Sequence, residues 1–258
     1  MSGTLTGRVA LVTGAARGMG ACISAALAAE GCSVALLDLD RAQAALDARV
    51  SEIGSGAMAV MADITSQEAV ARAFAAARER FGRIDILVNN AGMAESAPFG
   101  RTDLALWQKM IAVNLTGTYL CAREAYGTMA KQDYGRIVNI SSTAGLTGIA
   151  YVTAYCAAKH GVIGLTRSLA LEAAKTNVTV NAICPGYTET DLVKDAIANI
   201  IAKTGKSEAE ARAALVSGNP QGRMIQPSEV ANAVLWLCLP ASQSVTGQAI
   251  AVAGGEVM

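Results

Sequence analysis

The chain has 258 residues, with 21 basic and 21 acidic side chains and a formal net charge of zero. Charged residues make up 16% and hydrophobic residues 52% of the sequence, against about 25% charged residues in an average soluble domain. This composition excludes intrinsic disorder, and the zero net charge gives no electrostatic reason to expect binding to nucleic acid or to an anionic membrane.

Short aliphatic runs alternate with longer, Ala-rich amphipathic segments along the chain. The runs predict strands, and the amphipathic segments predict helices. Because the strands are apolar on both faces, a parallel sheet covered on both sides is expected. The predicted fold class is therefore α/β, a single Rossmann-type domain over residues 1–258 with a doubly wound sheet. The strands are expected at 8–13, 33–38, 57–62, 84–89, 135–141, 178–184 and 248–252, and the helices at 18–30, 41–53, 66–81, 103–131, 151–175 and 227–239.

One segment, residues 186–222, breaks this alternation because it contains no strand. Two short helices are expected there, and Ser207 with Glu210 forms a capping box for the second. Such an insertion follows the sixth strand and lies at the carboxyl edge of the sheet, where these folds bind ligands. It predicts a substrate lid, with a plain surface loop as the alternative.

The cysteines and the histidine do not indicate a metal site or a disulfide framework. Six cysteines are scattered without a CxxC pair, and no signal peptide precedes them, so they are interpreted as reduced thiols of a cytoplasmic protein. His160 is the one histidine, and it is expected to be a helix-surface or packing residue. No metal site and no membrane-spanning helix are predicted.

A glycine-rich turn joins the first predicted strand to the first predicted helix. Gly14, Gly18 and Gly20 permit a tight turn and let the backbone approach a pyrophosphate. The helix that follows would offer free N–H groups to the phosphates. Three glycines alone are weak evidence for a dinucleotide-binding turn, but their position between a predicted strand and a predicted helix makes this interpretation stronger.

Asp38 closes the second predicted strand and favours NAD over NADP as the cofactor. A carboxylate there accepts hydrogen bonds from the adenosine ribose hydroxyls and repels a 2′-phosphate. Leu39 follows, so no arginine stands beside Asp38 to bind that phosphate. Arg17 is the one residue that favours NADP, because its side chain could reach toward a 2′-phosphate. The alternative is that Asp38 caps the next helix.

Tyr155 and Lys159 share one helix face because they are four residues apart. A phenol titrates near pH ~10, and a nearby ammonium group favours the phenolate and lowers that pKa. Ser142 ends a predicted strand, where its hydroxyl could bond to the reacting oxygen. Taken singly, each of these residues is more often structural.

The ordered set of motifs resembles the short-chain dehydrogenase/reductase family over almost the whole chain. The matching residues are the glycine turn with Thr13, then Asp63, Asn89 to Gly92, Asn114, Ser142, Tyr155, Lys159 and Pro185–Gly186. The resemblance is closest to 3-hydroxybutyrate dehydrogenases and to 3-ketoacyl and polyketide ketoreductases.

The resemblance implies a role for each matching position. Tyr155 would be the acid/base, and Lys159 would hold the nicotinamide ribose and lower the Tyr155 pKa. Ser142 would polarise the carbonyl, and Asn114 would keep a water in a proton relay. The cofactor, NAD(H), would be bound by Gly14, Arg17, Gly18, Met19, Gly20, Asp38, Leu39, Asp63, Ile64, Asn90, Ala91, Gly92, Tyr155, Lys159, Pro185, Gly186, Thr188 and Thr190.

The expected substrate pocket is apolar. Hydroxybutyrate enzymes hold a free carboxylate with a Gln, a His and a Lys at positions that are here Ala94, Ala144 and Val152. A carboxylate among these side chains would lose its hydrogen bonds and solvation. An apolar or alicyclic ketone, or an acyl chain, suits the walls better. The expected wall residues are Ala94, Ser96, Ala144, Leu146, Ile149, Val152 and Tyr187.

The sequence thus predicts an NAD-dependent enzyme that interconverts a secondary alcohol and a ketone. A CoA-thioester reductase is an alternative, with Lys203, Lys206 and Arg223 near the phosphates or simply solvated. A dinucleotide-binding subunit without turnover is another. The helices at 103–131 and 151–175 carry small residues, including Ala122, Ala125, Gly161 and Gly164, and the resemblance implies that they pack across a two-fold axis in a homotetramer.

Overall fold

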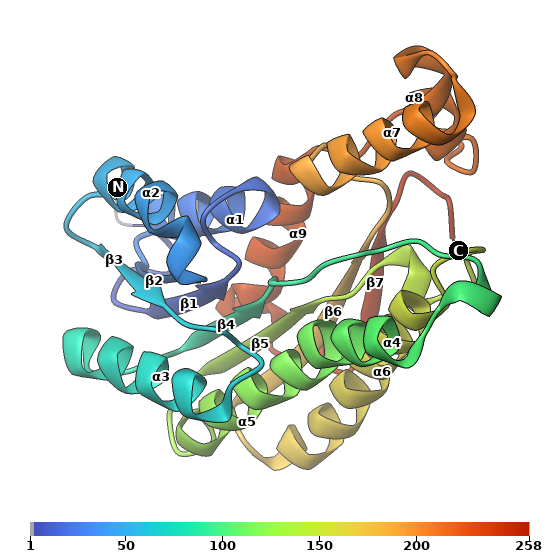
Figure 1. Ribbon diagram of the computed structural model, residues 1–258. Coiled ribbons are helices and arrows are strands. Elements are labelled where there is room, and N and C mark those ends of the chain that lie inside the picture. The colour runs from blue at the N-terminus through green and yellow to red at the C-terminus, as the bar shows by residue number, and fades with distance from the viewer. Residues whose placement is uncertain (1–2, 258) are drawn as a thin grey trace.

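A computed structural model, which describes residues 3–257, contains one seven-stranded sheet with helices on both faces (Figure 1). Every strand pair is parallel, and the strand order is β3-β2-β1-β4-β5-β6-β7. The predicted fold class is confirmed. The strands are β1 (Val9–Thr13), β2 (Ser33–Asp38), β3 (Ala57–Met61), β4 (Ile86–Asn89), β5 (Gly135–Ile140), β6 (Val178–Pro185) and β7 (Ala249–Val252).

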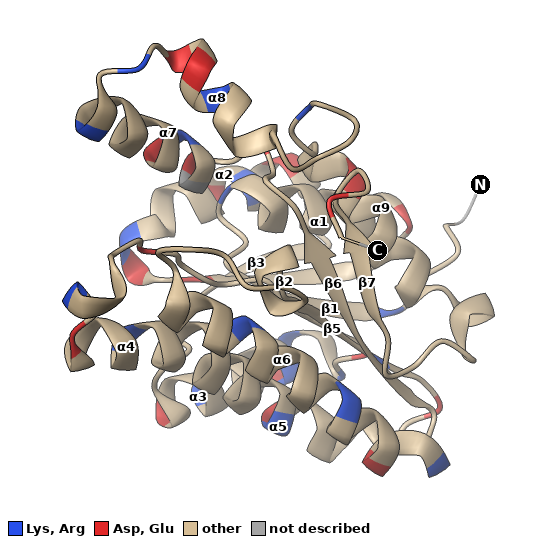
Figure 2. Ribbon diagram, turned by 90° about the vertical axis from the view of Figure 1, so that its right-hand side faces the viewer, with Lys and Arg blue, Asp and Glu red and all other residues tan. Residues whose placement is uncertain are grey.

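Two apolar cores lie on opposite faces of the sheet, because successive residues of a strand point in opposite directions. Val12 packs in the core under α1 and α9, whereas its neighbour Leu11 packs in the core under α3, α5 and α6. In Figure 2 the charged residues lie mainly on the helices and loops around the sheet. The covering helices are α1 (Gly18–Ala29), α2 (Gln43–Ile53), α3 (Gln67–Phe81), α5 (Gly117–Met129), α6 (Thr153–Glu172) and α9 (Pro227–Cys238).

The helix predicted over 103–131 is not continuous. It consists of α4 (Leu104–Ile111), a π-helical turn at Ala112–Thr116, and α5. Asn114 is fully buried in this wide turn, and its Nδ2 donates to the carbonyl of Met110 at 3.0 Å. A π-turn inside a helix is frequently found at a functional site. The hydrophobic pattern does not reveal it, because the apolar face continues through the turn.

The segment at 186–222 contains the two expected helices, α7 (Asp191–Thr204) and α8 (Glu208–Val216). The predicted capping box is present: Ser207 Oγ accepts from the Glu210 N–H at 3.3 Å, and Glu210 accepts from the Ser207 N–H at 2.8 Å. The pair has its own small core, which includes Val193, Ile197 and Ala211. The two helices project from the body of the molecule (Figure 1).

The remaining sequence features are placed as follows. All six cysteines are free, and five of them are buried. His160 is exposed on α6, with Nδ1 2.9 Å from the carbonyl oxygen of Cys156. Within residues 3–257 no helix is both long and apolar enough to span a membrane.

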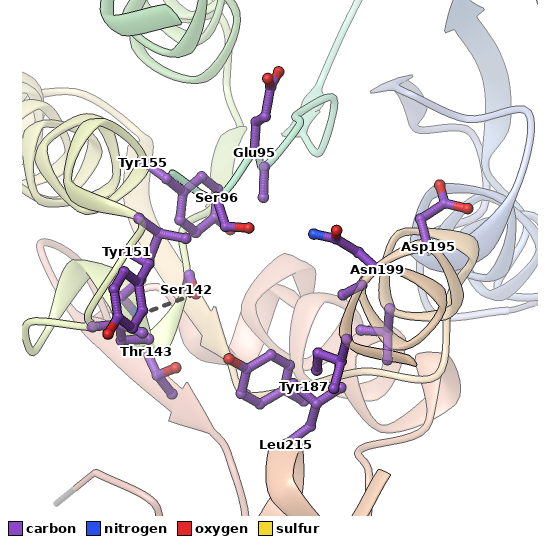
Figure 3. Close-up of a pocket in the computed structure, with 18 of the residues that line it drawn as sticks. Glu95, Ser96, Ser142, Thr143, Tyr151, Tyr155, Tyr187, Asp195, Asn199 and Leu215 are labelled. Carbon is purple, nitrogen blue, oxygen red and sulfur yellow. Dashed lines mark hydrogen bonds between the residues drawn. The ribbon is translucent and has the colours of Figure 1, made fainter. Parts of the chain in front are cut away.

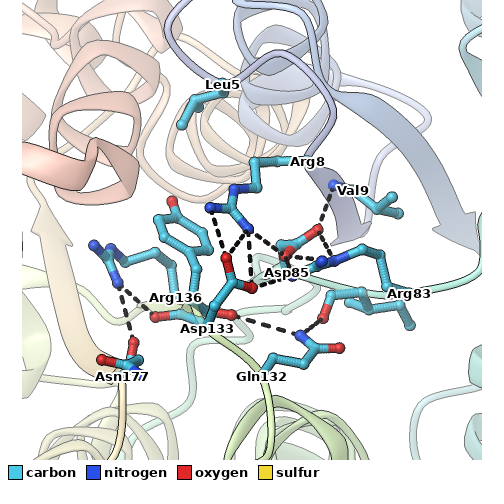
Figure 4. Close-up of polar contacts among 12 residues, drawn as sticks. Leu5, Arg8, Val9, Arg83, Asp85, Gln132, Asp133, Arg136 and Asn177 are labelled. Atoms are coloured by element: carbon cyan, nitrogen blue, oxygen red, sulfur yellow. Dashed lines mark hydrogen bonds and ion pairs between the residues drawn. The ribbon is translucent and has the colours of Figure 1, made fainter.

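A polar network joins the amino ends of the central strands (Figure 4). The Asp85 side chain is completely buried just before β4; it accepts from the Val9 N–H at 2.9 Å and from Arg83 Nε at 2.9 Å. Arg8 Nη1 lies 3.3 Å from the same carboxylate. Asp133 also pairs with Arg8 and Arg83, but its side chain is 67% exposed.

Replacing Asp85 with Ala should lower the free energy of unfolding by about 1–3 kcal/mol, because it leaves the buried Val9 N–H without its acceptor. Asp133→Ala, which removes the exposed carboxylate of the same network, should cost no more than about 1 kcal/mol. Urea denaturation followed by circular dichroism measures both values. Equal losses in the two variants would contradict the assignment of Asp85 as the central anion.

Candidate active site

Gly14 and Gly20 let the turn between β1 and α1 pack closely against itself and against the loop after β4. Gly14 has φ +65°, and a Cβ atom there would lie 2.9 Å from the Ala91 Cα. A Cβ on Gly20 would overlap the Gly14 carbonyl. Arg17 at the N-cap makes no side-chain capping bond, and no acid stands in the first turn. The first N–H groups of α1 are therefore free of a side-chain acceptor and suited to an anion.

The second and third strands place four of the predicted cofactor residues at the same edge. Asp38 accepts from the N–H of Ala16 at 3.1 Å and of Leu39 at 2.8 Å. It does not cap α2, because that helix starts at Gln43 after Ala42, so the capping alternative is wrong. Asp63 accepts from the Thr65 N–H at 2.8 Å, and Ile64 is buried.

Arg17 does not turn toward Asp38. Its Nη1 lies 3.6 Å from a carboxylate oxygen of Asp191, the first residue of α7, and both side chains are largely exposed. An exposed pair of this kind contributes little to stability. It does connect the glycine turn to the lid.

Ser142, Tyr155 and Lys159 come together beside the carboxyl end of β5. Ser142 follows β5 and lies beside the Tyr155 phenol, and its Oγ accepts a hydrogen bond from the Ala144 N–H at 3.2 Å. Lys159 is 4% exposed; its Nζ donates to the Ile140 carbonyl at 2.8 Å and lies 5.6 Å from the centre of the Tyr155 ring. The structure thus assembles a phenol, a hydroxyl and an ammonium group from two elements distant in sequence.

Burial controls the protonation of both titratable groups. It raises the pKa of Tyr155 to about 12, although the neighbouring Ser142 hydroxyl acts in the opposite direction. It lowers the pKa of Lys159 to about 8. The net shift of the Tyr155 pKa is upward because desolvation is the largest contribution, so the effect expected of Lys159 does not determine the net shift. At neutral pH Tyr155 therefore holds its proton.

Asn114 reaches the site through the loop that follows β4. Its Oδ1 accepts from the Met93 N–H at 3.1 Å, and its Nδ2 donates to the Met93 carbonyl at 2.9 Å. A Cβ on Gly92 would lie 2.9 Å from Asn114 Oδ1 and 3.6 Å from Lys159 Nζ. Only a glycine at 92 leaves this space beside the two polar groups open.

A cavity of about 950 Å³ opens in front of these residues (Figure 3). Tyr155 and Ser142 lie on one side of it, with Tyr187 and Asn199 opposite. Residues of the lid close that second side, as expected of a substrate lid. From the predicted cofactor set it is lined by Met19, Tyr155, Pro185, Gly186, Thr188 and Thr190, and from the predicted walls by Ala94, Ser96, Ala144, Ile149, Val152 and Tyr187.

Leu146 departs from its predicted place and is not among the lining residues. It ends the short helix Thr143–Gly145, and its N–H donates to the Thr143 carbonyl at 2.9 Å. Lys203 lines the cavity, but Lys206 does not, and Arg223 pairs with Glu229 at 2.7 Å.

Several lining residues carry no motif and were missed from the sequence. Tyr151 has φ +68°, and its carbonyl accepts from the Ala97 N–H at 2.8 Å, which links the two loops at the mouth. Thr143 could have been predicted to line the cavity from its position directly after Ser142. Glu95 is a further lining residue that was not expected, whereas Asp195, Asn199 and Leu215 belong to the predicted lid.

Comparisons with known proteins agree with this arrangement. A family profile described as Enoyl-(Acyl carrier protein) reductase matches residues 14–256. The chain is 40% identical over 258 residues to a 3-oxoacyl-[acyl-carrier-protein] reductase of Synechocystis sp., covering 98% of each protein. It is 39% identical over 249 residues to the cis-4-hydroxycyclohexanecarboxylate dehydrogenase of Sinomonas cyclohexanicum, covering 96% of each. The crystal structure of a variant actinorhodin polyketide ketoreductase with NADPH aligns with a TM-score of 0.92, 36% identity and 99% coverage of both chains.

The lowered pKa of Lys159 predicts a pH dependence of stability. The unfolded chain should bind this proton up to pH ~10.4, whereas the folded chain releases it near pH 8. Between these values the unfolded state holds more protons, so this contribution to stability rises with pH. The unfolding free energy of the wild type minus that of Lys159→Met should therefore increase from pH 8 to pH 10, by on the order of 2 kcal/mol.

Urea denaturation at each pH measures this difference. Lys175→Met, at an exposed lysine of the same region, is the control for loss of one charge. A difference between wild type and Lys159→Met that falls or stays flat over this range would contradict the effect of burial on Lys159.

Proposed function

Because the chain belongs to the short-chain dehydrogenase/reductase family, we propose that it interconverts a secondary alcohol and a ketone with NAD(H) as the cofactor. The observation that carries this proposal is that Tyr155 and Ser142 both line the cavity, with the Lys159 ammonium 5.6 Å from the centre of the Tyr155 ring. The family supplies the general class of oxidoreductase, and the choice of NAD and of substrate is our own inference.

The residues of the site have complementary roles in ketone reduction. A bound nicotinamide dinucleotide supplies the hydride for the carbonyl carbon. Ser142 donates a hydrogen bond to the carbonyl oxygen, and Tyr155 gives its proton to that oxygen as the C–O double bond becomes single. Lys159 stabilises the resulting phenolate by its charge, and Asn114 holds the loop and a relay water. In alcohol oxidation each transfer runs in reverse.

Asp38 supports NAD rather than NADP. Two backbone N–H groups hold its carboxylate at the end of β2, where it can accept bonds from ribose hydroxyls and repel a 2′-phosphate. Arg17, the one residue that could favour NADP, is paired with Asp191. One structural relative is described with NADPH, so the preference is a specific claim about this chain.

The walls favour an apolar or alicyclic ketone, or a 3-hydroxyacyl-type substrate. Ala94, Ala144 and Val152 all line the cavity, and none can bind a carboxylate. The CoA-thioester alternative depends on Lys203 alone, since Arg223 is engaged by Glu229. The alternative of a subunit without turnover is disfavoured, because phenol, hydroxyl and ammonium are all in place.

We further propose a cytoplasmic homotetramer, in which a second copy covers the exposed Trp107 and Tyr119 of α4 and α5. Of the small residues considered, Ala122 and Ala125 are buried inside the subunit and cannot contribute, whereas Gly164 is exposed. The free thiols suit a reducing compartment. A monomer in light scattering at micromolar concentration would contradict the tetramer.

Tyr155→Phe should lower kcat/KM for ketone reduction by about 10²–10⁴-fold, because it removes the proton donor and little volume. NADH oxidation at 340 nm with a panel of ketones measures the rate. NADH binding, followed by fluorescence, should persist in this variant and shows that it is folded. Undiminished turnover would contradict the assigned mechanism.

The wild type should prefer NADH over NADPH by at least ~10-fold in kcat/KM, and Asp38→Ser should reduce this preference by removing the charge that repels the 2′-phosphate. The control is Asp40→Ser, at an exposed acid two residues further on, which should leave the ratio unchanged. A wild-type preference for NADPH would overturn the role of Asp38.

A further inference from the structure

The segment after β7 brings a carboxylate to the wall of the cavity. Glu256 Oε1 accepts a hydrogen bond from the Thr143 hydroxyl at 3.3 Å, and a Cβ atom on Gly186 would lie 2.7 Å from Glu256 Oε2. Thr143 and Gly186 both line the cavity. Glu256 is therefore directly behind two of its wall residues, in a space that a side chain at 186 would fill.

Glu256 is not neutralised by a cation. The ion pairs formed by residues 3–257 do not include it. It is half-buried, and burial raises its pKa while the bond from Thr143 lowers it. Burial raises the pKa of Tyr187, and the charge of Glu256 adds to this rise. The one hydrogen bond recorded for its side chain is thus the bond from Thr143.

This bond determines what Thr143 can offer to a substrate. A hydroxyl group has one proton and two lone pairs. Since the Thr143 proton is directed to Glu256, lone pairs remain for the cavity. Thr143 is 3% exposed, so water competes little for them. Next to Ser142, which bonds to the carbonyl oxygen, the cavity thus presents a hydrogen-bond acceptor.

We propose that Glu256 is a positioning residue that fixes Thr143 as a hydrogen-bond acceptor, so that the enzyme selects ketones carrying a hydroxyl group on a carbon close to the carbonyl. This inference rests on the proposed function, and it names the substrate class within it. A hydroxyl can donate to Thr143, whereas a methoxy or methyl group at the same place cannot. A site built to bond a hydroxyl rejects an analogue that lacks it, because its buried polar group is left unpaired.

The test compares kcat/KM for 2-hydroxycyclohexanone, 2-methoxycyclohexanone and 2-methylcyclohexanone with the intact enzyme. The wild type should favour the hydroxy ketone over both analogues by at least ~10-fold. In Glu256→Leu no acceptor remains for the Thr143 proton, which can then turn into the cavity. The hydroxy-to-methoxy ratio should therefore fall toward unity.

Variants of Thr143 separate this role from a structural one. Thr143→Ser keeps the hydroxyl and should keep the preference, whereas Thr143→Val should abolish it while retaining activity on the methyl ketone. Asp195→Asn removes a different cavity carboxylate and is the matched control, with an unchanged ratio expected.

The possible failures are distinguishable. If the wild type reduces no ketone with either dinucleotide, the proposed function fails. If it reduces ketones but does not favour the hydroxy ketone, or if Glu256→Leu leaves the ratio at its wild-type value, the role of Glu256 and Thr143 is overturned and the proposed function stands.

Discussion

The site depends on a set of hydrogen bonds that join the carboxyl ends of β1 and β4. Thr13 Oγ1 accepts from the N–H groups of Asn90 and Ala91 at 3.0 Å each, and Asn90 Nδ2 donates to the carbonyls of Thr13 and Gly14 at 2.9 and 3.1 Å. At this pair of strands the chain connections diverge to opposite faces and leave a crevice. Because Thr13 is almost fully buried, water does not weaken these bonds. They fix the glycine turn relative to Gly92, and through Gly92 relative to Lys159.

The low charge content of the chain has a consequence at this crevice. Three polar side chains at the crevice are each held by a backbone partner: Lys159 by the Ile140 carbonyl, Asn114 by Met93, and Asp38 by two N–H groups. Polar groups held in this way need not reorganise when charge develops nearby. The apolar surroundings also raise the pKa of Tyr155 and lower the pKa of Lys159. The apolar composition that forms the sheet therefore also influences the protonation of these two groups.

The predictions from sequence succeeded or failed for identifiable physical reasons. The seven strands and the lid helices were predictable, because burial on both faces and a capping box are local patterns. The π-turn at Asn114 was not, since it depends on a side-chain bond across one turn of helix. Leu146 was misplaced because a short helix after Ser142 directs it away from the cavity. The net rise of the Tyr155 pKa could not be predicted, because the desolvation that causes it depends on the packing around the phenol and not on sequence spacing.

The sequence by itself determined the fold class and the positions of the glycine turn, Asp38, Ser142, Tyr155 and Lys159, because hydrophobic periodicity and short motifs are encoded by near neighbours. Only the tertiary structure decided what stands behind the cavity wall. Glu256 lies more than a hundred residues from Thr143 in the chain, and no local pattern links them. Their contact exists because β5, β6 and β7 are adjacent in the parallel sheet and end at the same edge, so the segments that follow these strands meet there.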